Sequence, residues 1–286
     1  MMKKIIVILI SVVLLSVNLF AQDSLLISQQ LLQMNSSSLI HTPESPQLIE
    51  NNKNYTVPIV ISAGTNLAAA VPVYNHMTSA WGLPDGKFHF KDDWSGDNLA
   101  LNDEISHLFV SYKLMQFFNS GYNFVGFSPK TAKILGIVET AFIVTAVEFP
   151  IDAFNPDQGF GISDLIFDYA GIAMAYMKIT NPALKNWDIK TSLKSLSYSN
   201  KNVIGSNSED YDNYIYWLTY RKSPAVFGLG YSTDHPQPYQ VDKQFYLAIG
   251  TTVPDLVRLI SPKIADKLNW MEVYYFNLKW NFATLK

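Results

Sequence analysis

The sequence of 286 residues contains no cysteine and few charged residues, and both features exclude whole classes of protein. Without cysteine there are no disulfides, thiolate metal sites, cysteine nucleophiles or lipid-bearing cysteines. Only 16% of the residues are charged, and 21 basic against 24 acidic side chains give a net charge of -3. No basic excess is available to bind a phosphate backbone, so nucleic acid is excluded as a partner. A nucleotide partner is not expected either, because no phosphate-binding Gly-Lys loop or dinucleotide fingerprint is present.

The first residues have the three parts of a secretory signal. Two lysines precede an apolar run over residues 5–15, and the small residue Ala21 lies before a polar stretch. We expect residues 1–21 to be a cleaved signal peptide, with a retained membrane anchor as the alternative. The predicted location is the bacterial periplasm or the periplasmic face of the outer membrane.

The rest of the chain divides into three parts by composition. Residues 22–58 are rich in Ser, Gln, Asn and Pro and predict a flexible arm. Residues 59–181 predict an apolar helical core of three to five helices, with the clearest over 101–118, 131–149 and 162–178, bounded by Gly121, Pro150 and other breakers. Pro72 is expected to divide any earlier helix.

Residues 182–286 predict a smaller, mostly antiparallel β part. Aromatic and β-branched residues mark strands near 188–197, 213–221, 225–232, 243–251 and 271–282, with one helix over 255–268. The fold class is therefore α+β. The charge also divides, because residues 22–181 carry 7 basic and 15 acidic side chains and residues 182–286 carry 12 and 9.

Ionisable residues occur on the apolar stripes of the predicted helices. Asp103 and His107 are four residues apart and share one helical face, and Asp164 and Asp168 do the same two helices later. Gly171 continues the second stripe and would allow another backbone to approach closely. Glu148 ends a stripe of the middle helix.

Burying a carboxylate is costly unless it is paired, protonated or bound to a metal. Between residues 98 and 180 few lysines are present to pair with the acidic side chains. We therefore expect six residues to converge on a possible divalent metal such as Ca, Mg, Mn or Zn: Asp103, His107, Glu148, Asp152, Asp164 and Asp168.

Two other interpretations of these residues stay open. His107 could act as a general base that Asp103 orients, which would make these two residues catalytic. The same side chains could instead only cross-link helices, with Asp103 as a favourable charge at a helix start and Ser163 and Asp164 as caps. The segment FHFKDDW, residues 88–94, is expected to be an ordinary polar loop.

The motifs resemble those of the YfiM-like proteins, a bacterial family of unknown function described as periplasmic lipoproteins. The family's Asp-Lys-x-x-His helix is similar to residues 103–107, where Glu104 replaces the lysine. Its Glu-then-Asp pair is similar to Glu148 and Asp152, and its third motif to the segment from Ser163 to Gly171. Strand segments around Trp217, Gly230 and Phe245 also match longer members, and a fainter resemblance is to VanZ-like membrane proteins. Neither family implies a known reaction, and the lipid-bearing cysteine is missing here.

Together these features predict an exported cell-envelope protein of unknown activity that is associated with a membrane. Its partner is expected to be membrane lipid or an envelope protein. The Asp/His/Glu cluster would serve cohesion or ion binding. The alternative is a hydrolase or transferase, metal-dependent or acid/base, that acts on an envelope lipid or glycan.

Overall fold

The structure is a computed structural model that describes residues 55–66, 75, 84–91, 100–194, 211–237, 240–268, 272 and 275–285. The predicted signal peptide, most of the predicted arm and Pro72 lie outside the described residues. The chain divides into two compact units. The described part of the first unit contains a helix over residues 56–66 together with residues 122–127. In this unit the ring of Phe127 stacks on Tyr55 at 5.4 Å and meets Tyr122 edge-on at 5.5 Å.

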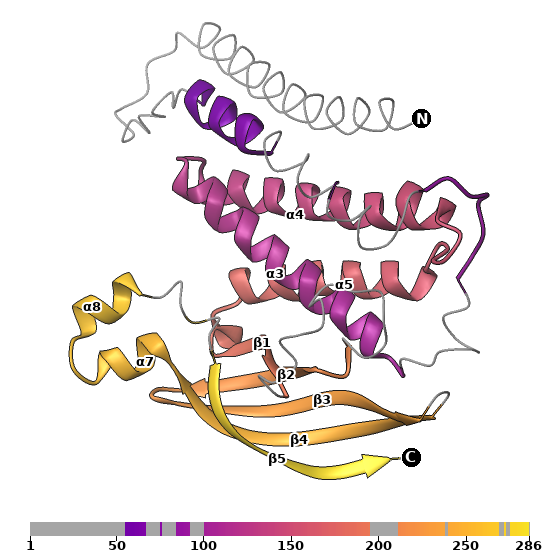
Figure 1. The fold of residues 1–286 in the computed structure, drawn as a ribbon. Helices are drawn as coiled ribbons and strands as arrows, with labels where there is room; N and C mark the ends of the chain where they lie inside the picture. Colours follow the sequence, from indigo (N-terminus) through magenta and orange to yellow (C-terminus); the bar gives the residue numbers. More distant parts are fainter. Residues whose placement is uncertain are drawn as a thin grey trace, which may run out of the picture. The chain divides into compact units, whose positions relative to one another are not determined.

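Three long helices form the first half of the second unit, apart from the last three residues of the first of them, which belong to the first unit (Figure 1). They are α3 (Asn102–Phe124), α4 (Pro129–Ala146) and α5 (Ile162–Thr180), which confirms the three helical predictions. Ser128 caps α4 by accepting a hydrogen bond from Thr131, and Pro129 takes the first helical position, where its missing N–H costs nothing. The prediction that Gly121 ends the first of these helices is wrong, because α3 continues to Phe124. Gly121 is exposed, and one glycine costs a helix only about 1 kcal/mol.

The predicted helix end at Pro150 is replaced by two irregular turns. Regular α4 geometry ends at Ala146, and a π-helical turn (Val147–Ile151) and a 3-10 turn (Asp152–Phe154) follow. Phe149 is extended, as the residue before a proline prefers. Within the described residues, Pro129–Phe154 is long and apolar enough to cross a membrane, a property shared by many core helices of soluble proteins.

The three helices pack closely through small residues. Figure 1 shows α3 crossing α4 and α5. A Cβ atom on Gly136 of α4 would lie 3.1 Å from the backbone nitrogen of Asn119, and one on Gly171 of α5 would lie 2.3 Å from the carbonyl oxygen of Leu108. The buried core of the helices includes Tyr112, Met115, Val144, Ile172 and Ala175, together with Ile189 from the sheet that follows them.

The second half is a five-stranded antiparallel sheet in sequential order (Figure 1). Its strands are β1 (Trp187–Leu193), β2 (Tyr214–Lys222), β3 (Ala225–Gln237), β4 (Gln240–Thr252) and β5 (Tyr275–Leu285). All five predicted strands and the α+β class are thereby confirmed. A short 3-10 turn, Pro182–Leu184, leads into β1. The single helix predicted over 255–268 is instead two, α7 (Val253–Arg258) and α8 (Pro262–Lys267), because Pro262 starts a new helix.

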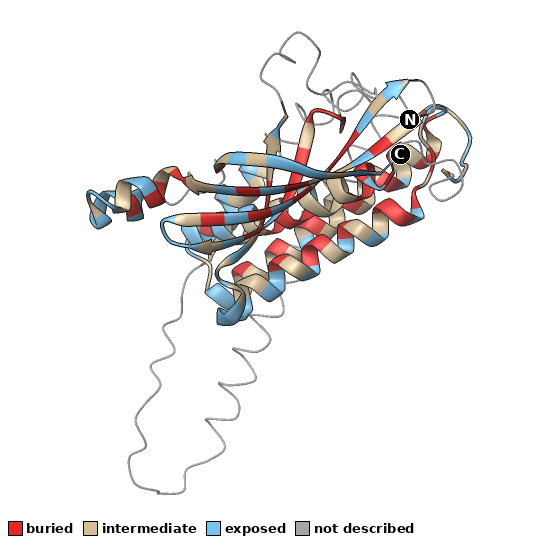
Figure 2. Cartoon of the chain, turned by 90° about the horizontal axis from the view of Figure 1, so that it is seen from below, coloured by how far each residue is buried: buried red, intermediate tan, exposed pale blue. Residues whose placement is uncertain are grey.

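Alternating residues of the sheet build a second core. Ile215, Trp217, Val226, Tyr246, Ala248 and Tyr275 are buried together on one face. Gly230 opposes Trp217 across β2 and β3, and a Cβ atom there would lie 2.6 Å from the indole ring. Figure 2 shows buried and exposed positions alternating along the strands.

The sheet curls so that its first and last strands approach each other. The Tyr275 hydroxyl on β5 donates to the Val226 carbonyl on β3 at 3.1 Å. Lys279 on β5 reaches the far edge and donates to the carbonyls of Leu193 and Lys194 at 2.9 and 3.1 Å. The inward face of the curled sheet is therefore filled by its own side chains.

A buried carboxylate joins the helices to the sheet. Asp188 on β1 accepts a hydrogen bond from the Tyr112 hydroxyl at 2.8 Å. It also lies 2.8 to 3.2 Å from the amino groups of Lys113, Lys178 and Lys190. These cations hold the pKa of Asp188 far below its usual range even though burial would raise it.

Candidate functional site

The six predicted site residues occupy one region between α3, α5 and the irregular turns after α4. Asp103 and His107 come from α3, Asp164 and Asp168 from α5, and Glu148 and Asp152 from the two turns. Two further residues complete what we call the His107 cluster, namely Lys91 and Tyr211. The predicted convergence is therefore a property of the structure, whereas the metal and catalytic roles stay predictions.

His107 lies at the centre of the cluster and touches a carboxylate on both sides of its ring. The Nδ1 atom lies 3.2 Å from Asp168 Oδ2 and 3.8 Å from Glu148 Oε1. The Nε2 atom lies 3.7 Å from Asp103 Oδ1 and 4.0 Å from Asp164 Oδ2. Asp168, rather than the expected Asp103, thus makes the hydrogen bond that fixes the ring. The side chain of His107 is 21% exposed, so small solutes can reach it.

Lys91 supplies the cation that sequence analysis did not find. Its amino group lies 2.6 Å from Asp103 Oδ2 and 2.9 Å from Asp164 Oδ2, and so bridges α3 and α5. The segment that carries it was expected to be an ordinary loop. Phe90, beside it, forms a bridge with Phe160 just before α5, which brings Lys91 to the cluster. Neither the spacing nor the composition of the segment signals this contact.

Tyr211 is a second residue that the sequence did not indicate. Its hydroxyl donates to Asp103 Oδ1 at 2.7 Å, over a separation of 108 residues. Asn102, next to Asp103, donates in turn to Thr233 Oγ1 on β3 at 2.7 Å. These bonds tie the start of α3 to the sheet. Long-range partners of this kind leave no periodic pattern in a sequence.

The fold favours negative charge at this place because two helices begin here. Asp103 lies in the first turn of α3 and Asp164 in the first turn of α5, where the helix dipole is positive. The Gly161 N–H, at the N-cap of α5, donates to Glu148 Oε2 at 3.1 Å. The expectation that Ser163 and Asp164 cap this helix is wrong, because Gly161 holds the N-cap position and no side chain caps it.

The cluster changes the proton affinity of its members. Burial alone would lower the pKa of His107, but the hydrogen bond to Asp168 and the charges of Asp103 and Asp164 outweigh it and raise that pKa to about 10. Burial raises the pKa of Glu148 to about 8, although the charge of His107 opposes it. His107 is therefore a cation at neutral pH, and Glu148 holds its proton readily.

The remaining carboxylates differ in the direction of their pKa shifts. Burial raises the pKa of Asp164, although Lys91 lies 2.9 Å away. Burial would raise the pKa of Asp103, but the charges of Lys91 and His107 lower it below its ordinary value. Burial raises the pKa of Asp152 to about 6 and also raises the pKa of Asp168. Two cationic side chains thus face five carboxylates in the described part of the cluster, and negative charge is in excess.

Three carboxylate oxygens of the cluster lack hydrogen-bond partners among the described residues. Glu148 Oε1, Asp152 Oδ1 and Asp164 Oδ1 are each inaccessible to solvent and accept no hydrogen bond there. A buried oxygen without a donor is costly and rare in folded proteins. Two groups of side chains have ligand atoms close enough to share one ion, namely Asp103 with His107 and Asp164, and His107 with Glu148 and Asp168.

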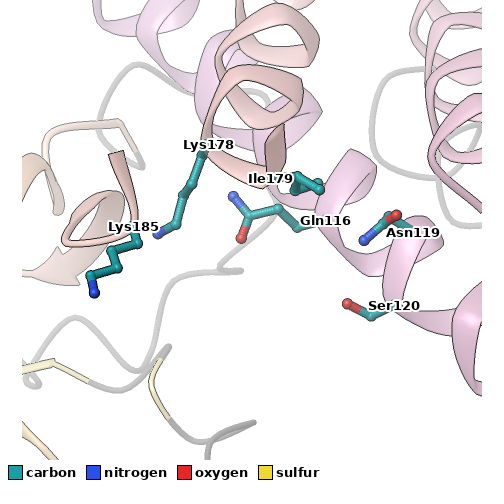
Figure 3. A pocket seen from close by; sticks show the side chains of 6 residues that line it. All are labelled: Gln116, Asn119, Ser120, Lys178, Ile179 and Lys185. Atoms are coloured by element: carbon teal, nitrogen blue, oxygen red, sulfur yellow. The ribbon is translucent and has the colours of Figure 1, made fainter. Parts of the chain in front are cut away.

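Other polar features of the described residues lie apart from the cluster. A pocket of about 250 Å³ is lined by residues of α3, residues of the end of α5, and Lys185 just before β1, as Figure 3 shows. It contains Lys178 and Lys185 but no residue of the His107 cluster. His235, which no sequence motif singles out, pairs with Asp212 at 2.8 Å on the sheet side.

Comparison with known proteins supports the location but supplies no reaction. Residues 93–180 match the model of a family described as predicted periplasmic lipoprotein (DUF2279), and this range contains all six predicted site residues. No curated protein and no solved structure matches the chain. The match supports an uncharacterised periplasmic family and confirms the predicted export to the periplasm or the periplasmic face of the outer membrane. The YfiM-like and VanZ-like resemblances stay predictions.

Proposed function

From the match of the helical half to a periplasmic family, we propose an exported, membrane-associated envelope protein that binds a divalent cation at His107, Glu148 and Asp168. One observation carries the cation proposal. Glu148 is 1% exposed, yet its Oε1 atom accepts no hydrogen bond from the described residues and lies 3.8 Å from His107 Nδ1. A cation at this point would satisfy that oxygen together with Asp168, which lies beside the same ring nitrogen.

The second possible set of ligands, Asp103, His107 and Asp164, is less suitable for a cation. Lys91 already lies on that side of the His107 ring. The Lys91 amino group contacts both Asp103 and Asp164, and a second positive charge there would be repelled. On the Nδ1 side no lysine among the described residues contacts Glu148 or Asp168. Lys91 therefore neutralises one half of the cluster and leaves the other half to an ion.

The spacing of the three ligand atoms fits a metal site. Ligands about 2.0 to 2.2 Å from an ion lie roughly 3.0 to 3.5 Å apart at tetrahedral or octahedral angles. The distances from His107 Nδ1 are 3.2 Å to Asp168 and 3.8 Å to Glu148, so small side-chain movements would complete the set. One imidazole and two carboxylates suit zinc or manganese. Asp103, on the Nε2 side, would then orient the ring as an outer partner.

Calorimetric titration of the purified protein with Zn²⁺ and, separately, Mn²⁺ tests the proposal, after removal of bound metal with EDTA. We expect one site per chain for at least one of the two ions. Glu148→Gln keeps the side-chain volume and removes a ligand charge, and should weaken that affinity at least about tenfold. Asp168→Asn should have a similar effect.

Glu139→Gln is the matched control, because Glu139 lies within α4, nine residues before Glu148, and is not a member of the His107 cluster. It should bind the ion as the parent does. The absence of binding to a folded parent, or equal affinities for the parent and Glu148→Gln, contradicts the proposed site.

A second function has one observation in its favour. The hydrogen bond between His107 and Asp168, with the ring partly exposed, is the geometry of a general acid/base pair. We therefore keep a hydrolase or transferase that acts on an envelope lipid or glycan as the alternative. His107 would move the proton and Asp168 would hold the ring.

Complementation of a deletion strain with His107→Ala separates catalysis from cohesion. A catalytic role predicts that His107→Ala fails to restore function to the deletion strain although its melting temperature is unchanged. A purely structural role predicts that function and melting temperature fall together.

Membrane association is supported by large apolar side chains that stay exposed. The matched family is described as lipoproteins, but this chain has no cysteine to carry the lipid, so its contact with a membrane would be through protein side chains. Flotation of the protein with phospholipid vesicles tests it directly. A protein that stays at the bottom of the gradient contradicts this part of the proposal.

A further inference from the structure

The outward face of the curled sheet carries two complete rows of apolar side chains. In each row the residues are neighbours across β2, β3, β4 and β5. The first row is Leu218, Leu229, Leu247 and Trp280, and the second is Tyr220, Phe227, Ile249 and Leu278. We call these eight residues the apolar band. Each is between 38% and 70% exposed.

The apolar band lies on the face of the sheet that α3 covers only in part. Tyr216, on the same face of β2 as Leu218, is buried and contacts Phe109 of α3, whereas the band itself is exposed. The other face of the sheet has a core of its own. Trp217, Tyr246 and Tyr275 fill the inward side, and their neighbours in sequence must point outward. An ordinary surface strand would place polar residues at these outward positions. Here both faces of the sheet are apolar.

The exposed area is larger than a typical soluble monomer carries. With roughly 150–250 Å² for each large side chain, the exposed fractions of the band give about 800 Å². The largest apolar patch of a monomeric protein is about 300–600 Å². A surface of this size therefore indicates a partner.

Charges are arranged around the band rather than within it. Along the outward positions, Lys222 at the end of β2 and Lys243 near the start of β4 are both exposed and lie beyond the two rows. Lysine stems can lie along an apolar surface while the amino group reaches outward. Residues 182–286 as a whole carry 12 basic and 9 acidic side chains, a net charge of +3.

We infer that the apolar band is a lipid-docking surface, which rests on an anionic phospholipid bilayer with Lys222 and Lys243 toward the headgroups. A bilayer accepts a continuous apolar surface that offers few hydrogen bonds, and Tyr220 and Trp280 have the amphipathic rings that favour its boundary. The positive charge of the C-terminal part complements anionic headgroups. The inference rests on the membrane association proposed above and is independent of cation binding.

Flotation with vesicles of phosphatidylethanolamine and phosphatidylglycerol tests the surface, with the full chain and a Leu229→Glu/Leu247→Glu double variant. Both positions are half exposed, so the charged side chains can be solvated in the free protein. We expect the vesicle partition coefficient of the double variant to fall at least tenfold, because charge on a lipid-facing strand is unfavourable. Circular dichroism checks that both proteins are folded.

Leu259→Glu is the matched control, since Leu259 is 68% exposed but lies after α7, away from the sheet. Its partition coefficient should stay within about twofold of the parent. A parent that floats while the double variant floats equally overturns the docking surface but leaves membrane association intact.

Two other outcomes also overturn the inference. A parent that does not float removes both the surface and the membrane association. A parent that is a dimer in solution, with a monomeric double variant and no flotation, shows that a second copy covers the band. Calorimetric titration of the same double variant with the divalent cation should give the affinity of the parent. The test of the lipid-docking surface is therefore separate from the test of the metal site.

Discussion

At Gly171, α5 approaches the backbone of α3 closely, and the geometry of the His107 cluster depends on this contact. A Cβ atom at this position would lie 2.2 Å from Ser111 Oγ, 2.3 Å from the Leu108 carbonyl oxygen and 3.0 Å from the Tyr112 nitrogen. Two of these atoms belong to the backbone of α3 and cannot rotate away. Gly171→Ala therefore requires α3 and α5 to separate by about 1 Å, since non-bonded atoms prefer about 3.5 Å.

Two effects of opposite sign set the size of the change. Alanine favours the helix by about 1 kcal/mol relative to glycine. Overpacking a well-filled interface costs about 1–3 kcal/mol, and we expect about 2–3 kcal/mol here because the clash is with backbone atoms that cannot rotate away. We expect a net loss of about 1–2 kcal/mol in the free energy of unfolding, which corresponds to a fall in melting temperature of roughly 2–8 °C.

The same displacement should reach the cluster. Asp164 lies about two turns and Asp168 about one turn before Gly171 on α5, and both would move away from Lys91 and His107. We therefore expect cation affinity to fall together with stability. Urea unfolding and calorimetric titration of the same preparation measure both quantities.

Gly121→Ala provides the control, because Gly121 is also helical but a Cβ atom added there would meet nothing within 4 Å. This change should be neutral or stabilise by up to about 1 kcal/mol. A Gly171→Ala protein as stable as the Gly121→Ala protein would refute the reasoning about close helix packing.

Three further predictions concern charge and backbone conformation. Asp188→Asn removes the carboxylate that neutralises three lysines, and should lower the free energy of unfolding in urea by about 3–5 kcal/mol. The control is Asp266→Asn, at a side chain that is 68% exposed, which should change this free energy by no more than about 0.5 kcal/mol. In EDTA, the free energy of unfolding should fall as the pH rises from 6.5 to 8. The folded state keeps protons on His107 (pKa about 10) and Glu148 (pKa about 8), whereas the unfolded chain releases them near pH 6.5 and 4.5. Each group can lower the free energy of unfolding by up to about 1.4 kcal/mol per pH unit. A stability that is level or increases over this range contradicts the raised pKa values. Leu101→Gly relieves a positive φ of 70° before α3 and should raise the melting temperature, with a stabilisation of up to about 1 kcal/mol; a lower melting temperature would contradict it.

The long elements were predictable because their patterns are local. Apolar runs between breakers predicted the three helices, and segments rich in aromatic and β-branched residues predicted the five strands. The errors came from weak local signals: Gly121 does not stop α3, and Pro262 divides the last helix. The strand order and the curl of the sheet depend on contacts such as that of Lys279 with β1, which no local pattern contains.

The site was half predictable for the same reason. Asp103 with His107 and Asp164 with Asp168 share helical faces, so their convergence follows from helix periodicity and the cost of burying charge. Lys91 and Tyr211 reach the cluster from outside these helices, and only the folded chain brings them there. Lys91, which bridges α3 and α5, lies outside residues 98–180, so its role as a counter-charge was not predictable from the residues around the helices.

The bond from Lys279 to the end of β1 has a further consequence for how the molecule meets its neighbours. An unpaired edge strand is a template on which another chain can add a strand and begin to aggregate. Here the carbonyls of Leu193 and Lys194 at one edge are occupied by a side chain from the opposite edge. An approaching chain therefore finds no free backbone acceptor on these two residues at this end of the sheet. This favours association through side-chain surfaces over the addition of a strand.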